Sequence, residues 1–446
     1  LAKTRSTQTL PPPQPVSLVH GWVFTVESLT LSALEIPLRH VTIQYMYIRS
    51  LSLRQFRTYN RLELDLPASP ILLLGANAQG KTSLLEAIAY LAVGRSPLTN
   101  TDRHLIDWRA IEAAMPFAHL KTEVVRRNRT DQIEIALEQK TLSNGNTRLE
   151  KQIKLNQHTI RQMDLAGHLN VVVFLPEDVE LVSGSPSGRR RFLDDLLSQV
   201  YPAYVEALEE YQTAISRRNA LLRHLRDFGG DAAQLAPLEE TLVHTGVTLS
   251  LYRRRIVKAL NFYADRLHHD LTGGSAWLQL QYEPNFDPLR PPAVDYQIGL
   301  LPETAGESPV DVDALHEAYR KTLRDRRHTE IDRGMTLTGP HRDELRFISD
   351  GVDMGTFGSR GQQRTVVLAL RLAELRWLEQ ETRESPILLL DEVLAELDRA
   401  RRTYLLGLLG NVEQTILCTT DAEMFPESFR EKTLLLEVAE GIIRRK

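Results

Sequence analysis

The chain has little of what a membrane protein or a disulfide-stabilised secreted protein needs. It contains one cysteine, Cys418, in 446 residues. A single cysteine excludes an intrachain disulfide and a cysteine-based zinc site, and it favours a reducing compartment, so we expect a cytoplasmic protein. No apolar run approaches the roughly 20 residues that cross a bilayer. We therefore expect no membrane partner, and no transporter subunit that carries its own membrane domain.

Charge of one sign is not in excess either. The 54 Lys and Arg residues are balanced by 58 Asp and Glu residues, for a net charge of −4. This balance gives no global signature of a nucleic-acid-binding protein, so any such binding must depend on local basic patches. The charged and hydrophobic fractions, 25% and 42%, are those of an ordinary globular protein. The length predicts roughly two or three domains.

Methionine is absent from the first 45 residues, where Pro11–Pro13 and Pro15 interrupt any helix. This segment has neither the basic start nor the compact apolar run of a signal peptide. Met46 is the first methionine and is followed by a strand-like stretch. We expect the folded part to begin at Met46 and residues 1–45 to be a flexible or artefactual N-terminal extension.

The strongest motif is a G-x-x-x-x-G-K-T sequence between an apolar strand and a helical pattern, which is the spacing and context of a P-loop. Its glycines let the backbone turn so that N–H groups point at phosphate oxygens. Lys81 supplies a positive charge for the β- and γ-phosphates, and the Thr82 hydroxyl is placed to ligate Mg²⁺. We predict ATP and Mg²⁺ as cofactors. The motif consists of Gly75, Ala76, Asn77, Ala78, Gln79, Gly80, Lys81 and Thr82.

The second half of a nucleotide site is predicted at Asp391 and Glu392, which follow the apolar run 387–390. An unpaired carboxylate at the end of a buried strand is costly, so we expect Asp391 to hold a hydrated Mg²⁺. Glu392 is placed to orient or deprotonate the attacking water, which makes Glu392 and Lys81 the candidate catalytic residues. The alternative is that the Asp-Glu pair only caps a helix.

Hydrophobic periodicity predicts an α/β fold. Alternating residues predict strands at 47–56 and 62–66, and antiparallel strands over 118–174. Helical spacing over 204–260 predicts an antiparallel helical hairpin inserted between the two halves of a nucleotide-binding domain, with a helical piece of the core as the alternative. From 345 to 418 strands and helices alternate again, which is typical of a parallel sheet layered by helices.

These patterns divide the chain after residue 45 into three segments. Residues 46–174 are expected to form the N-terminal half of an ATPase head, with the P-loop and the antiparallel strands. Residues 175–330 are expected to form a helical lobe and a linker, because 284–311 is rich in Pro, Gly and Asp. Residues 331–446 complete the head.

A further motif resembles the signature loop of ABC-type ATPases. Residues 358–362, Gly-Ser-Arg-Gly-Gln, stand at the start of a helical pattern and depart from Leu-Ser-Gly-Gly-Gln at Gly358 and Arg360. Residues 395–398 look like the D-loop, and residues 419–421 replace the usual switch histidine. The resemblance implies that the nucleotide is also contacted by Ser359, Gly361, Gln362 and Asp398.

An ordered series of motifs resembles the RecF family of bacterial recombination mediators. The motifs lie at 174–182, 184–194, 337–345 and 359–365, and the resemblance covers Met46 to the C-terminus. It implies an ABC-type ATPase head like that of SMC proteins, with a short helical lobe. It also implies an ATP-dependent homodimer, in which the signature loop of one subunit faces the P-loop of the other.

The same resemblance implies a role in DNA metabolism. RecF-like proteins bind single-stranded and double-stranded DNA at gaps, and act with RecR and RecO to place RecA. They support replication, recombinational repair and the SOS response. The resemblance further implies slow, DNA-dependent ATP hydrolysis that serves as a switch.

Basic clusters in the central region give independent support for DNA binding. Each cluster alone could be a solvated helix face, but together they favour a phosphate-binding surface. No base-reading motif is visible, so we expect contacts to backbone phosphates. The candidate DNA contacts are Arg189, Arg190, Arg191, Arg253, Arg254 and Arg255, with further clusters at 217–218 and 320–327.

Two histidine motifs are weak candidates for chemistry. His341-Arg342-Asp343 is expected near the nucleotide or the dimer face, and His268-His269-Asp270 is expected to be polar surface at a helix end. The alternative function is a soluble ABC-type ATPase that acts on a protein partner without binding DNA. An ATP-driven nuclease is not favoured, because no further metal-ligand cluster appears outside the ATP site.

Overall fold

The computed structural model describes residues 44–110, 116–126, 129–141, 147–286, 311–409 and 412–446. Most of the predicted N-terminal extension and most of the predicted linker at 284–311 lie outside these ranges.

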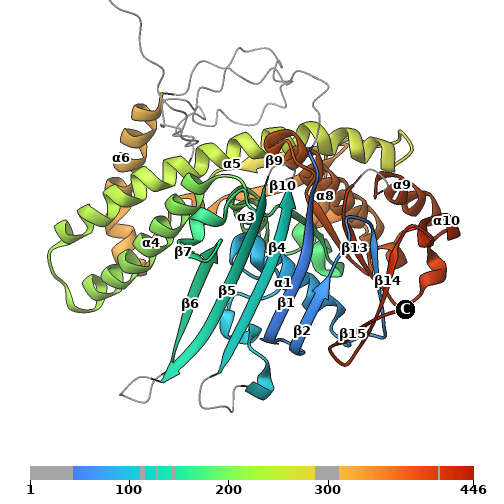
Figure 1. The fold of residues 1–446 in the computed structure, drawn as a ribbon. Helices are drawn as coiled ribbons and strands as arrows, with labels where there is room; N and C mark the ends of the chain where they lie inside the picture. Colours follow the sequence, from blue (N-terminus) through green and yellow to red (C-terminus); the bar gives the residue numbers. More distant parts are fainter. Residues whose placement is uncertain (1–43, 111–115, 127–128, 142–146, 287–310, 410–411) are drawn as a thin grey trace, which may run out of the picture. The chain divides into compact units, whose positions relative to one another are not determined.

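A six-stranded sheet forms the centre of the predicted ATPase head, in the order β15-β14-β3-β13-β12-β8 (Figure 1). The strands from β14 to β8 are parallel, and β15 pairs antiparallel with β14. Four of them are buried along their whole length, which explains their uninterrupted apolar sequences. The strands are β3 (Ile71–Leu74), β8 (Val171–Phe174), β12 (Ile387–Asp391), β13 (Thr415–Thr419), β14 (Leu434–Ala439) and β15 (Ile442–Arg445).

A second, antiparallel sheet has the order β2-β1-β4-β5-β6-β7. Its apolar side chains join those of both the first sheet and helix α1 (Lys81–Val93) in one hydrophobic core. Helix α1 is therefore covered by both sheets, and the start of the helix is held firmly. The strands are β1 (Met46–Phe56), β2 (Tyr59–Asp65), β4 (Phe117–Arg126), β5 (Thr130–Thr141), β6 (Thr147–Leu155) and β7 (His158–Ile160).

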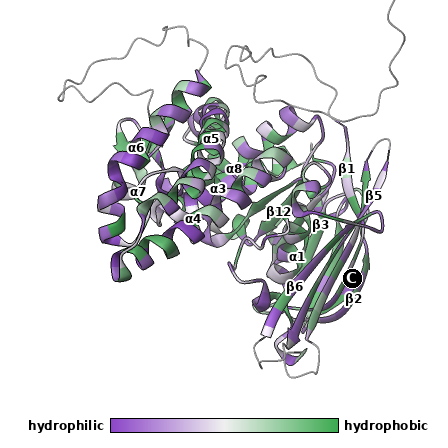
Figure 2. Cartoon of the chain, turned by 90° about the vertical axis from the view of Figure 1, so that its left-hand side faces the viewer, coloured by the Kyte–Doolittle hydropathy of each residue, from purple (hydrophilic) through white to green (hydrophobic). Residues whose placement is uncertain are grey.

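The predicted helical hairpin is confirmed. Helices α4 (Pro202–Phe228) and α5 (Ala236–Leu271) are joined by residues 229–235 and pack along each other (Figure 1). Helix α6 (Val312–Arg333) packs on both of them. Its ribbon is mostly purple with green patches in Figure 2, as expected for a helix that buries one side. Helix α5 also packs on α8 (Arg360–Thr382), which joins the lobe to the head.

The remaining elements connect the lobe to the two sheets. Strands β9 (Leu278–Glu283), β10 (Glu344–Ser349) and β11 (Val352–Asp353) form a small antiparallel sheet that packs on α5. Sequence periodicity did not predict β9, α6, β14 or β15. The other helices are α2 (Val179–Ser183), α3 (Pro186–Ser198), α7 (Met354–Phe357), α9 (Arg399–Leu409) and α10 (Glu427–Arg430). Among the helices in the described ranges, none has the length and apolar character of a bilayer span.

Two of the predicted basic clusters each contribute an arginine to an internal ion network. Arg218 on α4 is fully buried, and its guanidinium lies 2.7 Å from Glu330 Oε2 and 2.9 Å from Glu239 Oε1. Arg327 on α6 also pairs with Glu239. The prediction of a basic surface is therefore wrong for Arg218, because three helices surround its charge. The neighbouring Arg217 is exposed.

This network generates a stability prediction. Replacement of Arg218 by Met leaves the buried carboxylate of Glu330 without its cation, so we expect a loss of about 3–5 kcal/mol in the free energy of unfolding. Urea unfolding followed by circular dichroism measures this loss. Arg217→Met is the matched control, because it removes an exposed charge one residue away, and it should stay within about 0.5 kcal/mol of the parent. Equal stability of the two variants would contradict the role of the network.

Candidate nucleotide-binding site

The P-loop lies between β3 and α1, and its glycines are required by close contacts. A Cβ atom at Gly75 would lie 2.3 Å from the Val438 carbonyl oxygen. Gly80 has a φ of +114°, and a Cβ atom there would lie 2.8 Å from Thr58 Oγ1. No other residue fits either position without a shift of the backbone. The glycine pattern in the sequence therefore reflects the backbone geometry of this loop.

Lys81 is buried at the start of α1 and points back along the loop. Its ammonium group donates hydrogen bonds to the carbonyls of Gly75 at 2.7 Å and Ala76 at 2.9 Å. It also lies 3.2 Å from Glu392 Oε1. The structure thus brings together the two predicted catalytic residues.

Thr82 and Asp391 meet although 309 positions separate them in the chain. The Thr82 hydroxyl donates to Asp391 Oδ2 at 2.5 Å. Burial raises the pKa of Asp391 above its ordinary value, the charge of Glu392 adds to this effect, and the hydrogen bond from Thr82 opposes it. An adjacent hydroxyl and carboxylate are the oxygen ligands that Mg²⁺ prefers, so these two side chains fit the predicted metal.

Glu392 has the properties that a general base needs. Its side chain is 33% exposed, whereas Lys81 is only 4% exposed, so water can reach the carboxylate. The backbone of Glu392 has a φ of +50°, in the left-handed region that residues other than glycine rarely adopt. Such strain is held in place by its surroundings and is found often at functional sites.

The residues assigned to the signature and D-loops are placed differently. Ser359 caps α8: its hydroxyl accepts from the Gln362 N–H, and the Gln362 side chain accepts from the Ser359 N–H at 2.9 Å. Ser359, Gly361 and Gln362 are exposed. Asp398 caps α9 and pairs with Arg401 at 2.9 Å. In the described part of the chain, these four residues hydrogen-bond only within their own helix or its cap.

Three residues that hold the P-loop were not predicted from the sequence. The Tyr59 hydroxyl donates to the Gly80 carbonyl at 2.9 Å, and burial raises the pKa of Tyr59. The turn between β14 and β15 donates two N–H groups to Gln79, from Glu440 at 2.8 Å and from Gly441 at 3.1 Å. A glycine between two apolar alternating stretches is a hairpin signal that could have revealed this turn.

The residues in place of the switch histidine form a tight turn beside the P-loop. Thr419 Oγ1 donates to the Asp421 carbonyl at 3.0 Å and accepts from the Asp421 N–H at 3.1 Å. The Thr419 carbonyl accepts from the Gly75 N–H at 3.4 Å. This turn is therefore joined directly to the loop that surrounds Lys81.

The predicted DNA contacts occupy different environments. Arg253 is buried, 2.7 Å from Asp194 and 3.2 Å from Asp343, which contradicts a role in contacting DNA. Arg189 is largely buried and pairs with Glu344 at 2.6 Å. The other four are part-exposed: Arg190, Arg191, Arg254 and Arg255.

Both histidine motifs lie in packed structure. His341 is hydrogen-bonded to the Tyr211 hydroxyl at 2.7 Å, and burial together with nearby arginines lowers its pKa to about 4. His268, expected on the surface, is buried at the end of α5. Within the described ranges, no group of three or more His, Cys, Asp or Glu side chains could hold a metal ion.

Known proteins resemble this chain over almost all of the described structure. A family model for the RecF/RecN/SMC N-terminal domain matches residues 47–443. A relative from Chloroflexus aggregans named DNA replication and repair protein RecF is 39% identical over 406 residues, which cover 89% of this chain and 99% of the relative. A protein of the same name from Geobacillus thermodenitrificans is 35% identical over 399 residues, with 89% and 99% covered.

Solved structures agree with the sequence relatives. A structure described as the recombination mediator protein RecF with ATP in the RecFOR pathway has a TM-score of 0.75 and 26% identity, and the match covers 91% of this chain and 99% of that chain. The predicted α/β ABC-type ATPase head with a short helical lobe is thereby confirmed. From the family model and the near-complete coverage of its relatives, the chain belongs to the RecF family.

Proposed function

We propose that the protein is an ATP-gated DNA-binding protein that closes as a homodimer around two nucleotides. The proposal rests on the spatial separation of two sets of predicted site residues. The P-loop, Asp391 and Glu392 form a contiguous cluster, whereas Ser359, Gly361 and Gln362 are exposed at the start of α8. An exposed helix N-terminus offers N–H groups to a phosphate, so a second copy can complete each site.

Within each site the residues have separate tasks. The P-loop N–H groups and Lys81 hold the β- and γ-phosphates, and the contact with Glu392 keeps Lys81 in position. Thr82 and Asp391 are the residues that would hold Mg²⁺, which would supply charge neutralisation at the phosphates. Glu392 accepts the proton of the attacking water. Slow hydrolysis then opens the dimer and acts as a switch.

The proposed role of this switch is in DNA replication and recombinational repair. The support is the family membership, the names of the relatives and the description of a solved RecF as a recombination mediator in the RecFOR pathway. We propose contacts to the backbone phosphates of single- and double-stranded DNA at gaps. We further propose cytoplasmic action with RecR- and RecO-type partners, so that RecA is loaded and the SOS response is induced.

The assembly prediction concerns the catalytic pair. Lys81→Met removes the charge that holds the phosphates, so the variant should stay monomeric at saturating ATP. Glu392→Gln keeps nucleotide binding but removes the general base, so it should accumulate as the dimer. Sedimentation velocity with ATP, with ADP and without nucleotide measures both results. A monomeric Glu392→Gln protein at saturating ATP would contradict the proposal.

The interface prediction concerns Ser359, where a long charged side chain would stand between the two copies. Ser359→Arg should bind ATP as the parent does but fail to dimerise. Loss of the cap costs only about 1 kcal/mol, so the variant should fold. Ser359→Thr preserves the cap and serves as the control. Fluorescent-nucleotide titration and sedimentation separate the two effects, and a normal dimer of Ser359→Arg would place the interface elsewhere.

The DNA prediction discriminates this function from that of an ATPase acting on a protein partner. We expect gapped duplex DNA to be bound more tightly with ATP than with ADP or without nucleotide. Because the contacts are to phosphates, affinity should fall steeply as salt rises. Gel-shift titrations at several salt concentrations test this expectation. Absence of binding at low salt would favour the alternative function.

A further inference from the structure

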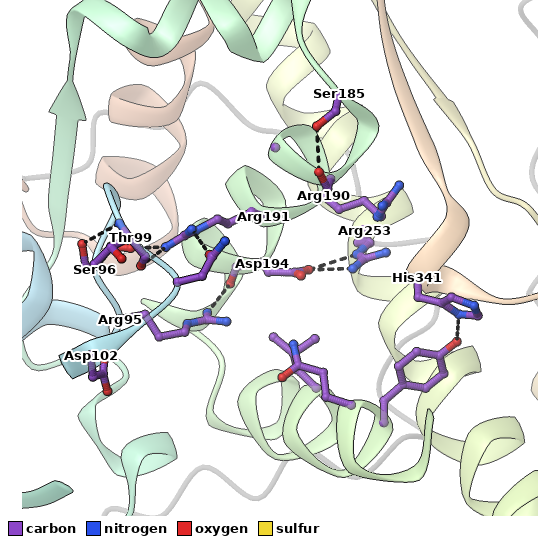
Figure 3. A pocket seen from close by; sticks show the side chains of 16 residues that line it. Arg95, Ser96, Thr99, Asp102, Ser185, Arg190, Arg191, Asp194, Arg253 and His341 are labelled. Carbon is purple, nitrogen blue, oxygen red and sulfur yellow. Dashed lines mark hydrogen bonds and ion pairs between the residues drawn. The ribbon is translucent and has the colours of Figure 1, made fainter. Parts of the chain in front are cut away.

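A polar cavity of about 560 Å³ lies apart from the P-loop, Asp391 and Glu392. It is bounded by α3, α4 and the segment that follows α1. Arginine side chains enter it from two sides (Figure 3): Arg95 and Arg191 at one side, Arg190 and Arg253 at the other. Each of these four arginines carries a positive charge, and carboxylates nearby balance most of that charge.

Three of the four arginines are already paired with carboxylates. Arg253 lies between Asp194 and Asp343, as described above. Arg95 is 3.1 Å from Asp195, and Arg191 is 3.5 Å from the same carboxyl group. Arg191 also donates hydrogen bonds to the Ser96 and Thr99 carbonyls, and these bonds hold the segment that follows α1. These contacts offset the charges of the three arginines.

Arg190 is the exception. Its Nη1 donates a hydrogen bond to the Asp343 carbonyl at 2.8 Å, and because a carbonyl is neutral the positive charge stays uncompensated by this contact. The nearby acids are paired with other cations: Asp194 and Asp343 with Arg253, Glu344 with Arg189, and Asp102 with Lys151 at 3.1 Å. Within the described residues, Arg190 therefore brings a partly buried positive charge to the cavity without an ion pair of its own.

Burial and neighbouring arginines lower the pKa of two groups that line the cavity. The pKa of Arg190 is lowered chiefly by its burial and further by the charge of Arg253, while Asp343, Glu344 and Asp194 oppose this shift. The pKa of His341, lowered chiefly by burial, is lowered further by Arg342, Arg190 and Arg253. An anion that entered the cavity would relieve this repulsion between positive charges.

The rest of the lining suits a phosphate better than a base. Ser185 and Ser187 place two hydroxyls 2.7 Å apart, and Gln212 adds an amide. The two aromatic rings of the lining, Tyr211 and His341, are hydrogen-bonded to each other at 2.7 Å, and Tyr211 is buried. Hydroxyl, amide and guanidinium donors recognise phosphate oxygens independently of sequence.

We propose that this cavity binds a backbone phosphate of DNA, with Arg190 as its principal cation and the Ser185 and Ser187 hydroxyls as further donors. The inference rests on the proposed DNA-binding function and assigns that function a place in the fold. This contact joins the DNA strand to α3, the helix that connects the head and the lobe. It is separate from the P-loop, so both sites can be filled together.

The first test removes the cation. Arg190→Gln retains a donor for the Asp343 carbonyl but loses the charge. Loss of one phosphate contact should reduce the salt slope of binding to gapped duplex DNA by about 0.9, which corresponds to about eightfold weaker binding at 0.1 M salt. Arg49→Gln is the matched control, because Arg49 is 51% exposed on β1, outside the cavity lining. Its salt slope should match that of the parent.

The second test fills the cavity with a negative charge. Ser187 is exposed in the first turn of α3, where an acidic residue interacts favourably with the helix dipole. Ser187→Glu should therefore melt at the parent temperature or above it, yet bind DNA at least as weakly as Arg190→Gln. A folding defect cannot produce this combination.

The outcomes separate the cavity from the function as a whole. If the parent protein binds no DNA at low salt, the proposed function fails. If the parent binds DNA and both variants bind it equally well, the inference about the cavity is overturned while the function stands. If inorganic phosphate at constant ionic strength raises the melting temperature of the parent but not of Arg190→Gln, and DNA affinity is unchanged, the cavity takes free phosphate only, which also overturns the inference.

Discussion

The contact between Thr82 and Asp391 is the constraint on which the head depends. These residues lie 309 positions apart, and they meet because β3 and β12 both pair in parallel with β13. Parallel strands present their carboxyl ends at one edge of the sheet, so the loop after β3 and the acids at the end of β12 converge there. A chain that failed to assemble this sheet would lack both the contact between Thr82 and Asp391 and the contact between Lys81 and Glu392.

The position of the helical lobe on the head depends on a second set of long-range contacts. The lobe is attached through buried ion pairs rather than through apolar contacts alone. Arg253 on α5 joins Asp194 on α3 to Asp343 beside β10, positions 59 and 90 residues away. Buried charges that must all be paired tolerate few alternative arrangements, so they favour one position of the lobe on the head.

Helix geometry accounts for the divided roles of the arginine clusters. Consecutive residues of a helix point about 100° apart, so three adjacent arginines on α3 meet different partners. Arg189 pairs with Glu344, whereas Arg190 and Arg191 enter the cavity from different sides and Arg191 also holds the segment after α1. Three adjacent arginines that look alike in the sequence thus have different roles. Arg189 forms a structural ion pair, Arg190 is a candidate ligand-binding residue, and Arg191 holds a neighbouring segment by hydrogen bonds.

The sequence by itself determined the features whose physical cause is local. The glycines of the P-loop, the apolar run before Asp391 and the helical spacing of α4 and α5 each follow from the backbone or the period of a single element. Only the tertiary structure decided which charges are buried, because Arg218 and Arg253 meet their partners across long separations in the chain. It also decided that Tyr59 and Gly441 support the P-loop. No local pattern encodes such contacts, since they arise only when the sheets and helices pack.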